Sequence, residues 1–301
     1  MVSFILILLA SLFFMGIVVR TKSLAAGRKG PGIFQPMKDI FRLWKKGSVY
    51  SKTTGLIFKI APTAYFASVL MAILMIPHGS NPGFISFDGD FVMFAYMLAF
   101  GKFFMIIAAL DTGSSFEGMG ASREALFSML VEPAFFVIMG SFALFTGHLS
   151  FQSIFYTLHY GSNISYMLGA LATLVLVMIS LVENSRMPVD DPNTHLELTM
   201  IHEVMVLDNS GFDLGTIMYT THLKFAMYGA IISNLFIGLL PLGISIPLFM
   251  LIQFAFAVAV GIIESFIARF RMGHNPQYIF ILTSVALLIF FGVLLVLGKF
   301  M

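Results

Sequence analysis

The sequence contains no cysteine and little charge. Cysteine is absent from all 301 residues, and only 11% of the residues are charged. The absence of thiols excludes disulfides, thiolate-ligated iron–sulfur clusters and cysteine zinc sites from this chain. Soluble domains carry about 25% charged residues, so the composition also excludes an ordinary soluble fold. If this chain works in redox chemistry, we therefore expect its metal centres to belong to another protein.

Most of the chain is apolar. Hydrophobic residues make up 58% of the sequence, and the mean hydropathy is +0.94. A helix that crosses a bilayer needs about 20 mostly apolar residues. Eight segments meet this requirement: 3–19, 55–77, 91–110, 126–147, 163–183, 222–242, 245–266 and 278–300. We therefore expect an all-α integral membrane protein, a bundle of about eight transmembrane helices in a single polytopic domain over residues 1–301.

The basic residues are distributed unevenly between the expected loops. Thirteen of the seventeen lysines and arginines fall on one side of the expected bundle. They are Arg20, Lys22, Arg28, Lys29, Lys38, Arg42, Lys45, Lys46 and Lys52 in segment 20–54, with Arg123, Arg186, Arg269 and Arg271 in later loops. Because cytoplasmic loops carry the excess of positive charge, we expect these loops in the cytoplasm and both termini outside. The outer loops carry His78, His148, His159, Asp88 and Asp90, which we expect to be solvated.

Segment 20–54 is a basic amphipathic cytoplasmic loop. After the turn residues at 30–32, apolar Met37, Ile40, Phe41 and Trp44 recur at helical spacing, with basic residues opposite. This pattern predicts an interfacial helix that begins near Gln35. The helix anchors the chain on anionic lipid or forms a wall of a partner-binding site, and the composition leaves both interpretations open.

The next cytoplasmic segment, 111–125, contains a Gly-Met-Gly-Ala-Ser sequence. Gly118 and Gly120 permit a tight backbone, and we expect a loop here. The third glycine and the preceding strand of a nucleotide-binding fingerprint are missing, so nucleotide binding is disfavoured.

The acidic cytoplasmic loop 184–221 follows the fifth expected span. Pro188 and Pro192 interrupt any helix that continues from Glu183, and a new helix can run from about Asn193 to Val206. The side chains of His195, Glu197, His202 and Glu203 could ligate a metal, but they do not have a recognised spacing. No hydrolase or P-loop motif is present.

Charged residues inside the expected spans point to an ion path. Charge in hydrocarbon is costly and usually faces the interior of the bundle, where it marks a relay. Lys102 and Glu132 are too deep to reach the interface, whereas Lys59, Lys224 and Glu264 either reach it by snorkelling or join the path. The predicted path comprises Lys102, Glu132, Glu183, Glu197, Glu203 and Glu264.

Three collinear motifs resemble the respiratory complex I subunit 1 family. They are Gly30-Pro31 with Gln35-Pro36, Gly120-Ala121-Ser122-Arg123 with Glu132, and Glu183 to Pro192 with Ser210-Gly211. The runs Arg123 to Leu126, Asp190 to Leu198 and Val206 to Gly211 are most similar to the branch of formate hydrogenlyase subunit 4 and hydrogenase-4 component C, membrane subunits of group 4 [NiFe]-hydrogenases. Complex I sequences have a more acidic run around the position of His195, and the hydrogenase branch does not require a quinone pocket.

The resemblance implies a membrane anchor and coupling subunit without a cofactor of its own. Iron–sulfur clusters and the nickel–iron site would lie on its partners: the hydrogenase large and small subunits, an iron–sulfur protein and an antiporter-like membrane subunit. The chain would sit in the inner membrane of a prokaryotic cell, link electron transfer to proton or sodium movement, and bind no nucleic acid. By position, Arg28, Gln35, Arg123, Arg186, Asp190 and Asp191 would shape the docking surface.

Two other functions remain open. One is the quinone-site subunit of a complex I-type dehydrogenase. The other is a free-standing secondary transporter, although such folds often show inverted repeats and the sequence has no convincing internal repeat.

Overall fold

The computed structural model describes residues 1–159, 163–191 and 200–298, and this part of the chain folds into helices without a strand. Seven of its helices are long and apolar enough to cross a membrane. They are α1 (Val2–Ala25), α3 (Leu56–Leu74), α4 (Asp90–Asp111), α5 (Ser115–Thr146), α7 (Asn163–Glu183), α10 (Leu242–Phe266) and α11 (Asn275–Val296). The prediction of an all-α membrane bundle is confirmed, although the count of eight spans is not.

The remaining expected span, 222–242, falls in α9 (Gly211–Ile237). This helix is not among the seven, because His222, Lys224 and Asn234 lower its mean hydropathy. It is nonetheless buried on nearly all sides, as expected for a helix at the centre of a bundle. The polar residues of α9 therefore face other helices of the same chain.

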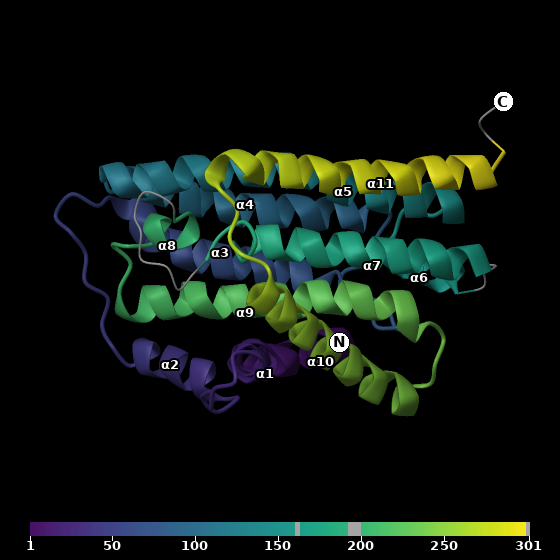
Figure 1. The fold of residues 1–301 in the computed structure, drawn as a ribbon, viewed down its shortest axis with the longest axis horizontal. Helices are drawn as coiled ribbons and strands as arrows, with labels where there is room; N and C mark the ends of the chain where they lie inside the picture. Colours follow the sequence, from purple (N-terminus) through teal and green to yellow (C-terminus); the bar gives the residue numbers. More distant parts are fainter. Residues whose placement is uncertain (160–162, 192–199, 299–301) are drawn as a thin grey trace.

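The long helices pack around α9. Figure 1 shows α5, α7, α9 and α11 running along the long axis of the molecule, with α10 crossing them obliquely. Helix α9 contacts α1, α3, α7 and α10, while α4 packs between α3 and α5. Four helices that are distant in the sequence, α4, α5, α7 and α9, thus meet in the interior.

Helix α5 begins well before the expected span. It runs over 32 residues from Ser115, so the loop predicted at 111–125 is wrong for most of its length. Gly120 lies within this helix because the position has no room for a side chain. A β-carbon there would lie 2.5 Å from Val204 Cγ1 and 2.9 Å from the Ile201 carbonyl oxygen. The glycine lets the segment after residue 200 pack directly on the first turns of α5.

The shorter helices are α2 (Gln35–Trp44), α6 (Phe151–Leu158), α8 (His202–Met205) and the 3₁₀ turn η1 (Met272–His274). The amphipathic helix predicted from Gln35 is confirmed as α2, which buries Met37 and Ile40. The helix predicted from Asn193 to Val206 is observed over α8 alone, and residues 192–199 lie outside the described part.

Two residues of the expected outer loops are buried, so the expectation that they are solvated is wrong for them. His78 is 1% exposed and Asp90 is 0% exposed. His78 Nε2 lies 3.1 Å from Ser245 Oγ, and Asp90 Oδ1 accepts from the Phe151 N–H at 2.7 Å. Each side chain supplies a hydrogen-bond partner to a buried group of another helix, which explains its burial.

Candidate functional site

Four charged side chains meet where α4, α5, α7 and α9 converge. Lys102 Nζ lies 3.0 Å from Glu183 Oε1 and 3.3 Å from Glu124 Oε1. Lys224 Nζ lies 3.2 Å from Glu183 Oε2. Lys102 also donates to Ser128 Oγ. We call Lys102, Glu124, Glu183 and Lys224 the central cluster.

The central cluster is buried and balanced in charge. Its side chains are 10%, 6%, 7% and 1% exposed for Lys102, Glu124, Glu183 and Lys224. Two lysines face two carboxylates, which is the arrangement that compensates for the loss of hydration. The snorkelling alternative is therefore excluded for Lys224, and Lys102 and Glu183 of the predicted path are brought into direct contact.

Local geometry holds the central cluster in place. Glu124 and Ser128 are four residues apart on α5 and so share one face of the helix. Ser185, whose φ is 47°, donates to Glu124 Oε2 at 2.9 Å. Gly101 brings α3 close to α4, since a β-carbon there would lie 2.9 Å from Tyr65 Cδ2.

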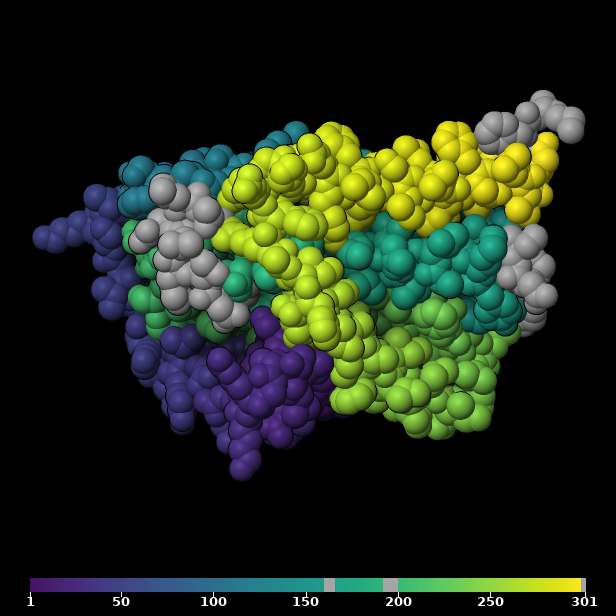
Figure 2. Space-filling model, viewed as in Figure 1, coloured from purple at the N-terminus to yellow at the C-terminus, as the bar shows by residue number. Residues whose placement is uncertain are grey.

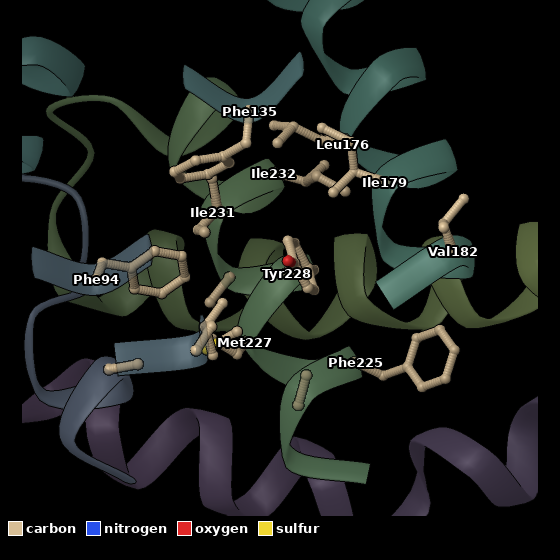
Figure 3. Close-up of a cluster of buried hydrophobic side chains, with 14 of the residues drawn as sticks. Phe94, Phe135, Leu176, Ile179, Val182, Phe225, Met227, Tyr228, Ile231 and Ile232 are labelled. Carbon is tan, nitrogen blue, oxygen red and sulfur yellow. The ribbon is translucent and has the colours of Figure 1, made fainter. Parts of the chain in front are cut away.

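Glu132 lines a small cavity beside the central cluster. The cavity has a volume of about 30 Å³, and Lys102, Glu183 and Tyr228 also line it. A water molecule needs about 10–15 Å³ of such space and several polar partners, so the cavity has room for one or two. Figure 3 shows Tyr228 among apolar side chains that include Phe135 and Ile231. Water in this cavity would connect Glu132 to the central cluster.

A much larger cavity lies between α1, α2, α8 and α9. Its volume is about 710 Å³, and we call it the polar cavity. Its charged and imidazole-bearing lining residues are Lys22, Arg28, Asp39, Arg186, Asp190, His202, Glu203 and His222. Arg186 follows Glu183 by three residues, so the end of α7 leads from the central cluster to this cavity.

Glu264 belongs to a second ion group rather than to the central cluster. It accepts from Arg186 Nε at 2.5 Å and from Arg186 Nη2 at 3.0 Å. Lys22 Nζ lies 2.8 Å from Glu264 Oε2. The Glu264 side chain is fully buried, so snorkelling is excluded here too, whereas Lys59 is exposed. Glu264 ties α10 to α1 and to the wall of the polar cavity.

Two of the predicted docking residues fix the segment after residue 200. Asp190 Oδ2 accepts from the backbone N–H groups of Ile201 at 3.1 Å and His202 at 3.2 Å, and Arg269 lies 2.9 Å from Asp190 Oδ1. Arg123 Nη1 donates to the Met200 carbonyl oxygen at 2.8 Å. Burial raises the pKa of the Asp190 carboxyl above its ordinary value, while the Arg269 charge and the N–H donors oppose this rise.

The remaining predicted residues are more dispersed. Arg28 is exposed and Asp191 is half-buried, and Gln35 Nε2 donates to Asp39 Oδ1 at 2.9 Å. Glu203 lines the polar cavity, and Glu197 lies outside the described residues. Within the described ranges no group of three or more histidine and acidic side chains could hold a metal ion.

Glu124 is the residue that the sequence analysis missed. Its signal was present, because Glu124, Ser128 and Glu132 recur every four residues and so lie along one helix face. Interpreting 111–125 as a loop placed Glu124 outside the helix and hid this periodicity.

Comparisons with known proteins identify the family. The NADH dehydrogenase family model matches residues 1–296. Hydrogenase-4 component C of Escherichia coli strain K12 is 31% identical over 240 residues, which cover 79% of this chain and 74% of that protein. Formate hydrogenlyase subunit 4 of the same strain is 26% identical over 260 residues, covering 83% of each chain.

A solved structure has the same fold. A chain in the structure of the membrane-bound sulfane sulfur reductase, an archaeal respiratory membrane complex, superposes with a TM-score of 0.80 at 19% identity and 97% coverage of both chains. The resemblance seen in the sequence motifs is confirmed. This multi-pass membrane protein belongs to the NADH dehydrogenase family, whose members resemble complex I subunit 1.

Proposed function

We propose that the chain is the membrane anchor and coupling subunit of a membrane-bound [NiFe]-hydrogenase or formate hydrogenlyase complex. Its partners would be hydrogenase large and small subunits, an iron–sulfur protein and an antiporter-like membrane subunit, which would carry every redox centre. The similarity to hydrogenase-4 component C and formate hydrogenlyase subunit 4 and the absence of cysteine support this assignment.

The observation that carries the proposal is the connection from the polar cavity to the central cluster. The cavity is lined in part by His202 and Glu203 of α8. The start of this short helix is held on α5 by Arg123 and on the segment after α7 by Asp190. A partner that docks against this segment would reach the central cluster through Arg186 and Glu183. Charge changes in the partner would then alter the proton affinity of paired lysines and carboxylates, which respond strongly to nearby charge.

The proposed orientation places the basic loops and α8 on the cytoplasmic side, with both termini outside. In this arrangement α9 is the eighth crossing, shielded from lipid by α1, α3, α7 and α10. Its buried lysine is tolerated because charged residues in membrane helices face the bundle interior and pair there.

Co-purification from mild detergent tests the assignment. We expect a complex that contains nickel and iron and has hydrogen-linked activity. The Arg123→Glu variant should lose the soluble arm while the chain stays in the membrane, and Lys59→Glu, at an exposed lysine on α3, is the matched control. Isolation of the wild-type chain as a stable monomer without redox partners would contradict the proposal.

A second candidate function is the quinone-site subunit of a complex I-type dehydrogenase. It is favoured by one observation, the polar cavity, whose 710 Å³ lie within the range of small-molecule sites, about 300–1,000 Å³. Bound quinone together with quinone-dependent turnover of the purified complex would support this alternative, and hydrogen evolution without quinone would exclude it.

A further inference from the structure

A separate cavity lies between α1 and α10, and it shares no lining residue with the central cluster. Its volume is about 410 Å³, which is within the range of ligand sites. We call it the apolar cavity. Its lining residues are Ala10, Phe13, Phe14 and Ile17 of α1, Ile33 and Phe34 before α2, and Met250, Gln253 and Phe254 of α10. Figure 2 shows α1, in purple, in contact with the yellow-green α10 on the near face of the molecule.

The walls of the apolar cavity are held in place by close contacts. Gly261 of α10 packs on α1, since a β-carbon there would lie 2.7 Å from Thr21 Cβ. Gly16 of α1 lies directly against the Ile33 carbonyl group. Arg20 Nη1 donates to the Gly30 carbonyl oxygen at 2.9 Å. The cavity is therefore part of the packed fold rather than a gap beneath a loose loop.

The chemistry of the walls favours hydrocarbon. Gln253 is the one polar side chain among the residues that line the cavity. Its Nε2 donates to the Ala226 carbonyl oxygen at 2.8 Å, and its Oε1 lies against Gly229. The amide thus faces α9, and the other eight lining residues have apolar side chains.

The apolar cavity has exposed lining residues, and exposed basic residues lie close to one of them in the chain. Phe34 is 58% exposed and Phe254 is 52% exposed, so both can contact lipid. Arg28, Lys29 and Lys38 are exposed close to Phe34 in the chain. No acidic residue precedes Asp39 in the sequence. Basic groups beside an apolar interfacial surface attract anionic lipid headgroups.

We propose that the apolar cavity binds one acyl chain of an anionic phospholipid, whose headgroup is held by Arg28, Lys29 and Lys38. The bound lipid would fill the space between α1 and α10 and fix the start of α2 at the membrane surface. The lining of the apolar cavity shares no residue with the central cluster or with the polar cavity, although Arg28 of the headgroup site also lines the polar cavity.

Native mass spectrometry of the full chain in mild detergent tests the proposal. Phosphatidylglycerol and phosphatidylcholine with identical acyl chains serve as probes. We expect the wild type to retain one phosphatidylglycerol at least fivefold better than phosphatidylcholine. Ala10→Leu, which fills the cavity, should reduce retention of both lipids, and Arg28→Gln with Lys29→Gln should abolish the preference. Lys45→Gln with Lys46→Gln is the matched control, because these lysines follow the last residue of α2 and lie roughly 16 Å along the helix axis from Phe34.

A second measurement does not depend on variants that could misfold. Phosphatidylglycerol with a photoreactive acyl chain, added to the wild-type chain in vesicles of that lipid, should crosslink mainly to Ile17, Met250 and Phe254. Crosslinks spread evenly over the exposed faces of α7 and α11 would overturn the proposal. Equal retention of the two lipids by the wild type, or displacement of phosphatidylglycerol by a stoichiometric quinone, would overturn it as well.

Discussion

Lys224 binds Glu183 twice. Its Nζ donates to the Glu183 backbone carbonyl oxygen at 2.7 Å and to the carboxylate at 3.2 Å. The carbonyl belongs to the last residue of α7, where helical carbonyl groups lack an internal partner. One lysine of α9 thus caps α7 and neutralises the carboxylate that Lys102 approaches from the other side. The same lysine therefore stabilises the end of α7 and fixes the position of the Glu183 carboxylate.

Glu183→Gln should destabilise the chain, because it leaves Lys102 and Lys224 with one carboxylate between them. Removing one partner of a buried ion pair costs about 3–5 kcal/mol. The double variant Glu183→Gln with Lys224→Met should recover part of this loss, since both members of the pair are then absent. Chemical unfolding in detergent, arranged as a double-mutant cycle, measures the coupling, and a double variant less stable than the sum of the single changes would contradict the account.

Glu132→Gln should behave differently. Glu132 is half-buried, and in the part of the chain that the structure describes it has no ion pair within 4.0 Å. The free energy of unfolding of the Glu132→Gln variant should therefore differ from that of the wild type by less than about 0.5 kcal/mol, whereas ion movement per turnover should fall. Thermal unfolding and vesicle ion uptake on the same preparation separate the two effects. A large loss of stability would show that Glu132 is structural.

Gly120→Ala should weaken the packing of the segment after residue 200, which includes α8, on the first turns of α5. The added methyl group would meet Val204 and the backbone of Ile201, and overpacking of this kind costs about 1–3 kcal/mol. Gly118→Ala is the matched control two residues earlier, where the nearest atom, Leu110 Cδ2, is 3.8 Å away. Assembly of the soluble arm should fall in Gly120→Ala alone, and an equal yield of complex from both variants would argue against the role of α8.

Asp190→Ala and Asp190→Asn should differ in local stability, and the stability of Asp190→Asn relative to the wild type should depend on pH. Asp190→Ala removes the acceptor of the buried Ile201 N–H and of the partly buried His202 N–H. A buried N–H left unpaired costs about 1–3 kcal/mol, so hydrogen exchange at Ile201 and His202 should accelerate. Asp190→Asn keeps an acceptor oxygen. Because the folded-state pKa is raised, the contribution of Asp190 to stability is present below its unfolded value and is lost as pH rises through the folded value. Asp190→Asn should therefore gain stability relative to the wild type as the pH rises from the unfolded value, 3.8, through the raised folded value. A loss of relative stability over the same rise would contradict the assigned cause.

The sequence was sufficient to predict the membrane class, α2 and most helix positions, because these depend on hydropathy and periodicity along one segment. The pairing of Lys102 with Glu183 could not be predicted from local sequence, because 81 residues separate the two and only the convergence of α4, α5, α7 and α9 in the interior brings them together. Glu124 was missed because glycine content was interpreted as a loop signal, whereas Gly120 serves close helix packing. Asp90 and His78 are buried because other helices need their hydrogen-bonding groups, and hydropathy does not report such pairing.

The number of ions moved per hydrogen molecule is the most direct test of the central cluster. Complexes that carry Glu124→Gln or the control Asp88→Asn, at an exposed residue, should be matched by nickel content and reconstituted into vesicles. Ion uptake into the vesicles and the amount of hydrogen produced are then measured in the same sample. The account predicts that Glu124→Gln lowers the ratio at least fivefold while Asp88→Asn leaves it unchanged. An unchanged ratio in Glu124→Gln, with the complex fully assembled, would contradict a coupling role for the central cluster.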